Sequence, residues 1–511
     1  MKKLVLYLLV IQAVFFACKS GQSVGTQKSN TVDITFLHLN DVYEISPLEG
    51  GKMGGMARVA TIRQELLAKN PNTLTILAGD FLNPSLIGTF KHEGKSIKGK
   101  QMVEVMNAMG MDWVGLGNHE FDVDEAELQD RINLSKFNWL ASNALHNNKG
   151  NLEPFAKNGV PFPKTTILTF KNQQGNEVKM GMFSILLPSN KKDFVVYDDF
   201  FESAQKAYES LRTQCDFVVA ITHINKADDA KLAAMLPDIK LLMGGHDHDN
   251  MIETIGKVTI AKADANAKTV YIHHISYDTK TKKVSVSSEL KKVDNQIADE
   301  PTVAAVVKKW EEILDAGIKK MGLNKNDIVT ETTVPLDGRE SSIRNFQTNL
   351  GTAIAKGMSQ VSSQPNDCAI FNGGSVRIDD QLLGKITQLD IMRVLPFGGK
   401  IVEVQMKGRL LEQVLITGLK NKGNGGYLQW DKITYNEAKN EWNINGKLLD
   451  INQEYYVVMP KFLIEGKETN LGFLTDKNPD VLKITEPDSN NQNDVRSDIR
   501  KVLIAYLKGT K

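Results

Sequence analysis

Cysteine is scarce in this chain of 511 residues, which contains only three. Cys18 lies near the N-terminus, while Cys215 and Cys368 each precede an apolar run that is typical of a buried strand. We therefore expect the two later cysteines to be small core residues, and we expect no disulfide between them. A fold without a disulfide framework must be stabilised by burial of apolar side chains, and a chain of this length can form more than one core.

The sequence also has no excess of charge of either sign. It contains 62 Lys and Arg against 61 Asp and Glu, which gives a formal net charge of +1. Proteins that bind nucleic acid polymers present a basic face, so this balance argues against a dedicated nucleic-acid binder.

Long apolar runs are confined to the N-terminus. Two lysines precede an apolar run over residues 4–17, which is too short to span a bilayer but has the n-region and h-region of a signal peptide. The end of this run resembles a bacterial lipobox that places Cys18 at the cleavage point. We expect residues 1–17 to be a signal peptide, Cys18 to carry a lipid anchor, and residues 18–31 to form a tether in the periplasm or cell envelope. The alternative is an ordinary signal peptide followed by a chance cysteine.

The rest of the chain indicates two α/β regions. Between residues 32 and 295, short apolar strands alternate with helical stretches, and strand pairs favour a layered β-sandwich flanked by helices over a single doubly wound sheet. Residues 301–322 predict one helix, because a proline lies near its start and a glycine ends it. We expect a linker over residues 296–325 and a second α/β domain over residues 326–511.

Six polar residues of the first region each follow a short apolar run that predicts a buried strand. The carboxyl ends of parallel strands meet at one edge of a sheet, so these side chains are expected to lie close together. Carboxylate oxygen, amide oxygen and imidazole nitrogen together suit a pair of divalent cations. The six residues are Asp41, Asp80, Asn118, His223, His246 and His248.

Two cations need a ligand that bridges them, and the two oxygens of Asp80 make it the candidate. Asp41 and His248 would complete one site, and the remaining three residues would complete the other. Two cations so placed polarise a phosphoryl oxygen and lower the pKa of bound water. Single motifs of this kind occur by chance, but five strand-end motifs in this order predict a two-metal hydrolase.

His119 directly follows Asn118 in the segment Gly-Asn-His-Glu, so its side chain is expected to face away from the ligand set. Asp122 lies three residues further on and can hold one nitrogen of the imidazole. The other nitrogen is then free to stabilise a phosphoryl transition state or to protonate the leaving group.

With these motifs the chain resembles the bacterial 5′-nucleotidase family, whose members join a calcineurin-like metallophosphoesterase domain to a C-terminal substrate-binding domain. The resemblance runs from about residue 32 to the end of the chain. It implies that the six strand-end residues are metal ligands and that His119 and Asp122 form the catalytic dyad. It also implies two divalent ions of the Mn, Zn or Co type and a nucleoside 5′-monophosphate as the small-molecule substrate.

The C-terminal region contains further motifs of this family. By resemblance, three arginines would bind the anionic part of the substrate, since guanidinium groups suit phosphate, and an asparagine would help to line the same site. Phe397 would stack on one face of the base and Phe473 on the other, although ordinary core packing is the alternative for both rings. The polar residues are Arg339, Arg344, Asn372 and Arg377.

Two segments depart from the family pattern. The family usually has Asp-x-His at the first motif, where this chain has Asp41-Val-Tyr43, and it often has Gln at the position of His248. Either His248 restores an imidazole to the same metal, or that metal binds more weakly and Tyr43 merely packs. The segment before Phe473 also lacks the aspartate of the Gly-Gly-Asp-Gly-Phe run that the family often has.

These departures leave rival functions open. Within enzymes, the rivals are a phosphodiesterase for nucleotide-sugars or 2′,3′-cyclic nucleotides and a thiosulfohydrolase of the same superfamily. The arginines and Phe397 favour nucleotide-like substrates over the latter. A surface nucleotide-binding protein with weak catalysis is the rival from a different class, and Tyr43 is the residue that suggests it.

Overall fold

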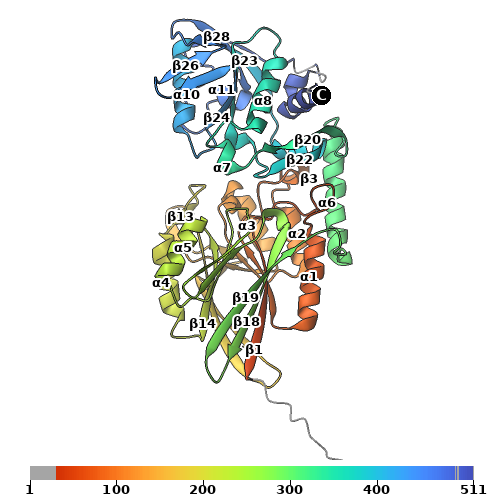
Figure 1. Cartoon of the computed structure of the whole chain (residues 1–511), viewed down its shortest axis with the longest axis vertical. Coiled ribbons are helices and arrows are strands. Elements are labelled where there is room, and N and C mark those ends of the chain that lie inside the picture. The colour runs from red at the N-terminus through yellow and green to blue at the C-terminus, as the bar shows by residue number, and fades with distance from the viewer. Residues whose placement is uncertain (1–29, 489–490, 492–493, 510–511) are drawn as a thin grey trace, which may run out of the picture.

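The computed structural model describes residues 30–488, 491 and 494–509, and Figure 1 shows two α/β parts stacked along the long axis of the molecule. The expected signal peptide, the lipid anchor at Cys18 and all but the last two residues of the tether lie outside the described residues. Within the described part of the chain, no helix is both long and apolar enough to cross a membrane. The cysteines at positions 215 and 368 are both free thiols.

The N-terminal part is built on two six-stranded sheets that face each other. Apolar side chains from both sheets, including Phe36 and Met182, form a shared inner layer. The first sheet has the order β19-β18-β1-β2-β5-β6, with bounds β1 Thr31–Leu39, β2 Thr73–Ala78, β5 Trp113–Gly115, β6 Asn138–Leu140, β18 Thr269–Asp278 and β19 Lys283–Lys292. The second has the order β11-β12-β14-β15-β17-β16, with bounds β11 Thr165–Lys171, β12 Glu177–Leu186, β14 Phe217–His223, β15 Leu241–Gly244, β16 Met251–Ile255 and β17 Val258–Lys262.

Helices cover the outer faces of both sheets, which confirms the expected layered sandwich (Figure 1). The first sheet is covered by α1 Met56–Lys69, α2 Lys100–Met109 and α3 Glu125–Leu134, and the second by α4 Phe200–Leu211 and α5 Lys226–Met235. Short strands lie in the connecting loops: β3 Lys91–His92, β4 Lys95–Ser96, β7 Ala144–Asn148, β8 Asn151–Glu153, β9 Ala156–Lys157, β10 Val160–Pro161 and β13 Val195–Tyr197.

The strand directions place the polar strand-end residues at one edge. Strands β1, β2 and β5 are parallel neighbours in the first sheet, and β14 and β15 are parallel neighbours in the second. Their carboxyl ends therefore lie on the same side of the sandwich, where open α/β sheets bind their ligands.

Helix α6 (Pro301–Lys320) extends from one part of the molecule to the other (Figure 1). The carboxylate of Glu300 caps it by accepting a hydrogen bond of 2.8 Å from the backbone N–H of Val303. Trp310 is buried in the core of the N-terminal part, whereas Ile318 packs in a small cluster with Leu86 and with Met392 of the C-terminal part. The helix thus contacts both parts, as a linker between them would.

The C-terminal part has its own sheet and its own apolar clusters. Its five strands have the order β24-β21-β28-β23-β29, with bounds β21 Cys368–Asn372, β23 Ile401–Lys407, β24 Leu428–Asp431, β28 Glu454–Pro460 and β29 Val481–Thr485. Helices α8 (Asn349–Gln360) and α12 (Ile499–Gly509) pack in one cluster, and α10 (Gly408–Lys420) packs in the other. The helices of this part are α7 Glu340–Ile343, α8 Asn349–Gln360, α9 Gln388–Val394, α10 Gly408–Lys420, α11 Lys461–Ile464 and α12 Ile499–Gly509.

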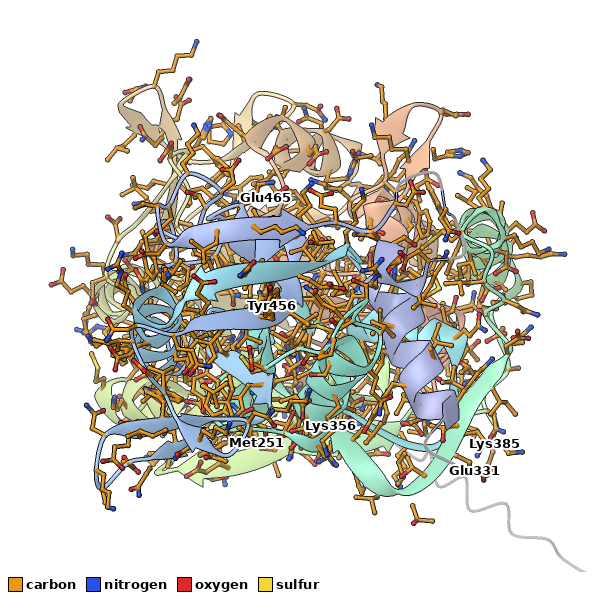
Figure 2. All side chains as sticks on the ribbon, turned by 90° about the horizontal axis from the view of Figure 1, so that it is seen from above. Met251, Glu331, Lys356, Lys385, Tyr456 and Glu465 are labelled. Atoms are coloured by element: carbon orange, nitrogen blue, oxygen red, sulfur yellow. The ribbon has the colours of Figure 1, made fainter. Side chains whose placement is uncertain are left out.

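A long strand pair lies between this sheet and the N-terminal part (Figure 1). Strand β20 (Ile328–Asp337) pairs with β22 (Gln381–Thr387), and Figure 2 labels one pair of partners within this ladder, Glu331 and Lys385. A smaller sheet contains β25 Ile433–Asn436, β26 Glu441–Ile444 and β27 Lys447–Leu448. The separate cores agree with two domains, while their expected boundaries, 32–295 and 326–511, remain predictions.

Candidate metal centre

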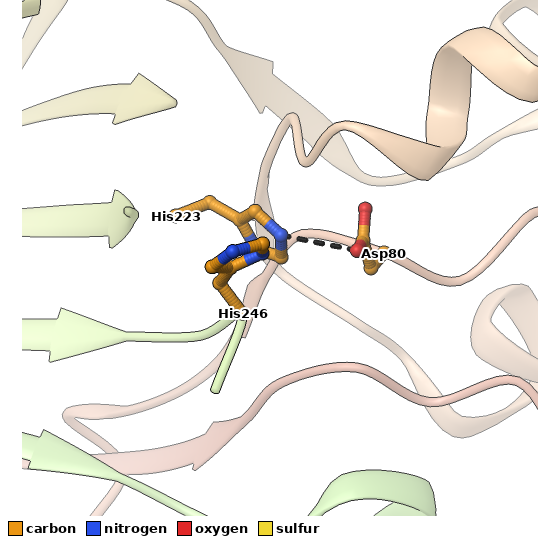
Figure 3. A group of neighbouring side chains, drawn as sticks. All are labelled: Asp80, His223 and His246. Atoms are coloured by element: carbon orange, nitrogen blue, oxygen red, sulfur yellow. Dashed lines mark ion pairs between the residues drawn. The ribbon is translucent and has the colours of Figure 1, made fainter. Parts of the chain in front are cut away.

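Three of the expected ligands form a compact group at the carboxyl edge of the sandwich. Atoms of Asp80, His223 and His246 that can bind a metal ion all lie within 4.8 Å of one another, and Figure 3 shows the three side chains together. The Nε2 atom of His223 lies 3.1 Å from Oδ2 of Asp80 and 3.2 Å from Oδ1 of Asn118. Its Nδ1 atom is 2.7 Å from the carbonyl oxygen of Ala78. A proton held there leaves the lone pair of Nε2 free for a metal ion.

A second group lies beside the first. Oδ1 of Asp41 is 3.2 Å from Nε2 of His248 and 3.9 Å from Nε2 of His223. The hydroxyl of Tyr43 donates a hydrogen bond of 3.2 Å to Oδ2 of Asp80 and is also 3.2 Å from Nε2 of His248. Tyr43 therefore does more than pack, because its hydroxyl lies in the site between a carboxylate and an imidazole.

The donor atoms of these groups fit divalent cations. The carboxylate of Asp41 is fully buried, and its Oδ1 atom faces the imidazole nitrogens of His248 and His223 without a well-aligned hydrogen bond. A buried anionic oxygen that lacks such a hydrogen bond is costly, and a cation beside it would remove that cost. Burial is the largest of the effects that lower the pKa of His246 to about 4, so its imidazole is neutral and can act as a ligand.

Four of the expected ligand residues have strained backbone conformations. The φ angles are 53° at Asp41, 59° at Asp80, 84° at His246 and 62° at His248. Residues other than glycine rarely adopt positive φ, and such strain persists where the surrounding structure enforces it, often at functional sites. Gly117 shows how tightly these turns pack, because a Cβ atom there would lie 2.2 Å from Oδ1 of Asp80.

The expected dyad is present at the rim of the centre. Nδ1 of His119 lies 2.7 Å from Oδ2 of Asp122, within a short 3₁₀ helix over residues 119–122. Asn83 and Asn190 donate further hydrogen bonds of 2.9 and 2.8 Å to the same carboxylate. Burial alone would raise the pKa of Asp122, but the charges of His119 and Arg377 hold it well below its usual range. The carboxylate is therefore ionised and can orient the imidazole.

The sequence analysis missed Glu120, although it lies in the Gly-Asn-His-Glu segment. Its buried carboxylate accepts hydrogen bonds from the backbone N–H groups of Asp80 (2.9 Å), Phe81 (2.8 Å) and Gly117 (2.7 Å). Burial and the charge of Asp80 raise the pKa of Glu120 to about 7. Glu120 thus ties the loop that bears Asp80 to the loop that bears Asn118.

Lys262 was also missed, and it supports the other two ligand loops. It is fully buried and donates hydrogen bonds to the carbonyl oxygens of Ile224 (2.6 Å) and Gly245 (2.8 Å), next to His223 and His246. Its Nζ atom is also 2.7 Å from a carboxylate oxygen of Asp229. A lysine at the end of an apolar strand was the only signal of this role in the sequence.

A cavity of about 690 Å³ lies next to the dyad, mostly within the C-terminal part. Arg377 lines it and also lies 3.3 Å from Oδ2 of Asp122, while Asn190 lines it from the N-terminal part. These two residues connect the cavity with the metal centre. Among the expected substrate residues, the cavity is lined by Arg344, Asn372, Arg377 and Phe397.

The structure does not bring two of the expected substrate residues to this cavity. The guanidinium of Arg339 makes hydrogen bonds of 2.9 and 2.8 Å to Asp337 in its own loop and lies outside the lining. Phe473 packs against an apolar core cluster and is absent from the lining. Phe462 lines the cavity instead, and its side chain is 41% exposed.

Comparison with known families and proteins agrees with this geometry. The calcineurin-like phosphoesterase family matches residues 34–250, and the 5′-nucleotidase C-terminal domain matches residues 328–474. Human 5′-nucleotidase is 26% identical over 543 residues, which cover 93% of this chain and 89% of that protein. The trifunctional nucleotide phosphoesterase YfkN of Bacillus subtilis is 26% identical over 437 residues, which cover 78% of this chain but 28% of YfkN.

A solved structure has the same architecture over almost the whole chain. The 5′-nucleotidase precursor of Thermus thermophilus superposes with a TM-score of 0.69 at 21% identity, and the match covers 94% of this chain and 97% of that one. The two family matches together span most of the chain and lie on the two α/β parts seen in the structure. This chain is therefore a metal-dependent phosphoester hydrolase of the 5′-nucleotidase family, with a calcineurin-like phosphoesterase domain followed by a 5′-nucleotidase C-terminal domain.

Proposed function

We propose that this protein uses two divalent cations of the Mn, Zn or Co type to hydrolyse nucleoside 5′-monophosphates to nucleoside and phosphate. The observation that carries the proposal is the junction at Arg377, whose guanidinium lines the cavity and reaches the dyad carboxylate at 3.3 Å. A phosphate bound to this guanidinium lies beside the metal centre, while the rest of the substrate occupies the cavity. The names of the similar proteins, human 5′-nucleotidase among them, support the same substrate class.

The proposed ligands would divide between two ions, with Asp80 as the ligand common to both. Asp41 and His248 would hold one ion, and Asn118, His223 and His246 the other. When bound, the ions supply an activated water molecule and polarise the phosphoryl group. His119, held through Nδ1 by Asp122, presents its other ring nitrogen to the reacting phosphate and gives a proton to the departing nucleoside oxygen.

The cavity supplies binding groups for the nucleotide. The guanidinium groups of Arg344 and Arg377 bind the phosphate by charge-assisted hydrogen bonds, and Asn372 adds a polar contact. Phe397 is 60% exposed and offers a free ring face to a base. Phe462 takes the place that Phe473 was expected to fill.

A phosphodiesterase acting on nucleotide-sugars or 2′,3′-cyclic nucleotides is the second candidate. The similarity to YfkN, named as a trifunctional nucleotide phosphoesterase, favours it, although that match covers a minor part of YfkN. The arginines and exposed phenylalanines that line the cavity remain an argument against a thiosulfohydrolase. A binding protein with weak catalysis would lack turnover with any metal.

The domain limits and the location are part of the same proposal. We place the phosphoesterase domain at residues 32–295, the linker at 296–325 and the substrate-binding domain at 326–511. We also propose export after removal of residues 1–17, with a lipid on Cys18 and residues 18–31 as the tether. Labelling of cells with radioactive palmitate tests the anchor, since Cys18→Ser should abolish incorporation.

The direct test of the reaction is phosphate release from AMP by metal-free protein before and after addition of Mn²⁺, Zn²⁺ or Co²⁺. The proposal expects negligible release without metal and recovery with at least one of the three. Equal release in the presence of excess chelator, or none with any metal, would refute it.

A further inference from the structure

One imidazole of the metal centre is held from the other domain. Nε2 of His248 lies 3.2 Å from Oδ1 of Asp41, and its Nδ1 lies 2.5 Å from Oδ2 of Asp379. His248 follows β15 in the phosphoesterase domain, whereas Asp379 precedes β22 in the C-terminal domain. The imidazole of His248 therefore joins Asp41, a proposed metal ligand, to the carboxylate of Asp379. Asp379 lies more than 100 residues after His248 in the sequence.

Asp379 is itself firmly placed. Its Oδ1 atom accepts a hydrogen bond of 2.6 Å from the backbone N–H of Glu340, and its side chain is 21% exposed. Its φ angle of 41° lies in the region that residues other than glycine rarely adopt. A carboxylate held this way cannot easily turn to another partner, so its contact with His248 is set by the surrounding structure.

We propose that Asp379 is a positioning residue for His248, and that the C-terminal domain thereby completes one site of the metal centre. This inference rests on the proposed function, because it requires His248 to bind a metal ion. With a proton on Nδ1 directed at Asp379, the lone pair of Nε2 points toward Asp41 and the ion. Histidine ligands commonly have such a carboxylate partner, which fixes the ring orientation and the tautomer.

The contact between His248 and Asp379 matters more in this chain because Tyr43 stands where the family usually has a histidine. A neutral phenol is a poor ligand for most divalent cations, so the site that contains Asp41 depends on the imidazole of His248. The hydroxyl of Tyr43 donates a hydrogen bond of 3.2 Å to Oδ2 of Asp80, as a protonated phenol does. Moving the C-terminal domain away would remove Asp379 from His248 and weaken metal binding at this site. By linkage, a bound metal ion would favour the arrangement of the domains in which Asp379 contacts His248.

The neighbouring residue provides a matched control. Asp380 pairs with Lys268 of the phosphoesterase domain at 2.7 Å, so it also joins the two domains, but its side chain does not touch the metal centre. Asp380→Asn removes one ion pair between the domains and leaves His248 untouched. Asp379→Asn removes the partner of His248 with the same change of charge.

The experiment is titration of the metal-free protein with Mn²⁺ by calorimetry, together with the visible absorption spectrum of the Co²⁺ form. We expect Asp379→Asn to weaken one of the two sites by about 10- to 100-fold and to change the Co²⁺ spectrum. Asp380→Asn should match the unmodified protein in both readouts, and Asp379→Glu should recover part of the affinity. Circular dichroism confirms that each variant is folded.

A double-mutant cycle separates positioning from a general effect on the fold. If Asp379 acts through His248, then Asp379→Asn causes no further loss of affinity in a His248→Ala background. Three results would overturn the inference without affecting the proposed metal centre. They are additive losses of metal affinity in the double variant, unchanged metal affinity in Asp379→Asn, and an equal loss of metal affinity in Asp380→Asn. Failure of the unmodified protein to bind any divalent cation would instead overturn the proposed function, and this inference with it.

Discussion

The guanidinium of Arg377 lies 3.3 Å from the carboxylate of Asp122, although the two residues belong to different domains. Asp122 also holds His119, so one carboxylate contacts both the proposed proton donor and a proposed phosphate-binding group. In this arrangement of the domains, Arg377 lines the cavity and contacts the dyad at the same time.

Replacing Arg377 tests whether this residue links the cavity to the dyad. Arg377→Ala should raise KM for AMP by about tenfold or more, because each hydrogen bond to a charged group contributes about 1.5–3 kcal/mol. Steady-state kinetics at constant ionic strength measures it. Arg339→Ala is the matched arginine control, since Arg339 binds Asp337 outside the cavity, and it should change KM little. The reverse order of effects would show that the sequence-based assignment of Arg339 was the better one.

The aromatic residues make a second prediction. Phe397→Ala should weaken binding of AMP by about 1–3 kcal/mol, the contribution of one stacked base, while hydrolysis of glycerol phosphate changes little. Phe462→Ala should have a smaller effect in the same direction. Phe473→Ala should leave KM unchanged and lower the free energy of unfolding by about 2–3 kcal/mol through lost core packing. A rise in KM with Phe473→Ala alone would contradict the cavity described above.

Glu120 provides a third prediction, about stability rather than contact with the substrate. Glu120→Gln replaces one oxygen by an NH₂ group that faces backbone N–H donors, which leaves buried donors unsatisfied at a cost of about 1–3 kcal/mol each. Urea unfolding should show this loss, and metal affinity should fall because two ligand loops separate. Glu125→Gln, at an exposed carboxylate that pairs with His146, should alter neither quantity appreciably.

The N-terminal cap of helix α6 makes a prediction about pH. The hydrogen bond from the backbone N–H of Val303 is the main reason that the pKa of Glu300 lies below its usual 4.5. A depressed carboxyl pKa gives stability that is present above the unfolded value and is lost as pH falls through the folded value. Glu300→Ala should therefore cost about 1 kcal/mol at pH 7 and less below about pH 4, as measured by urea unfolding of the metal-free protein. A difference that does not vary with pH would exclude the capping role of the charge.

The sequence predicted the layered α/β fold well, because that fold follows from local patterns, whereas the ligand set remains a prediction. Apolar runs that end in Asp41, Asp80 or His223 indicate strands and their carboxyl edge together. The positions of Arg339 and Phe473 depend on loop conformation, which a motif does not determine, so resemblance alone did not show that both lie outside the cavity lining. Glu120 and Asp379 act through backbone N–H groups and a contact between domains, and neither leaves a periodic or compositional signal.

The most direct measurement is phosphate release from a panel of substrates, with Mn²⁺, Zn²⁺ and Co²⁺, by the protein and its His119→Ala variant. The panel contains AMP, UMP, a UDP-sugar, a 2′,3′-cyclic nucleotide and p-nitrophenyl phosphate. His274→Ala is the matched control, because His274 is exposed and lies outside the site. We predict fast turnover of AMP or UMP that falls by about 10²- to 10⁴-fold in His119→Ala and persists in His274→Ala. No turnover of any nucleoside monophosphate with any of the metals, or equal turnover in His119→Ala, would contradict the account.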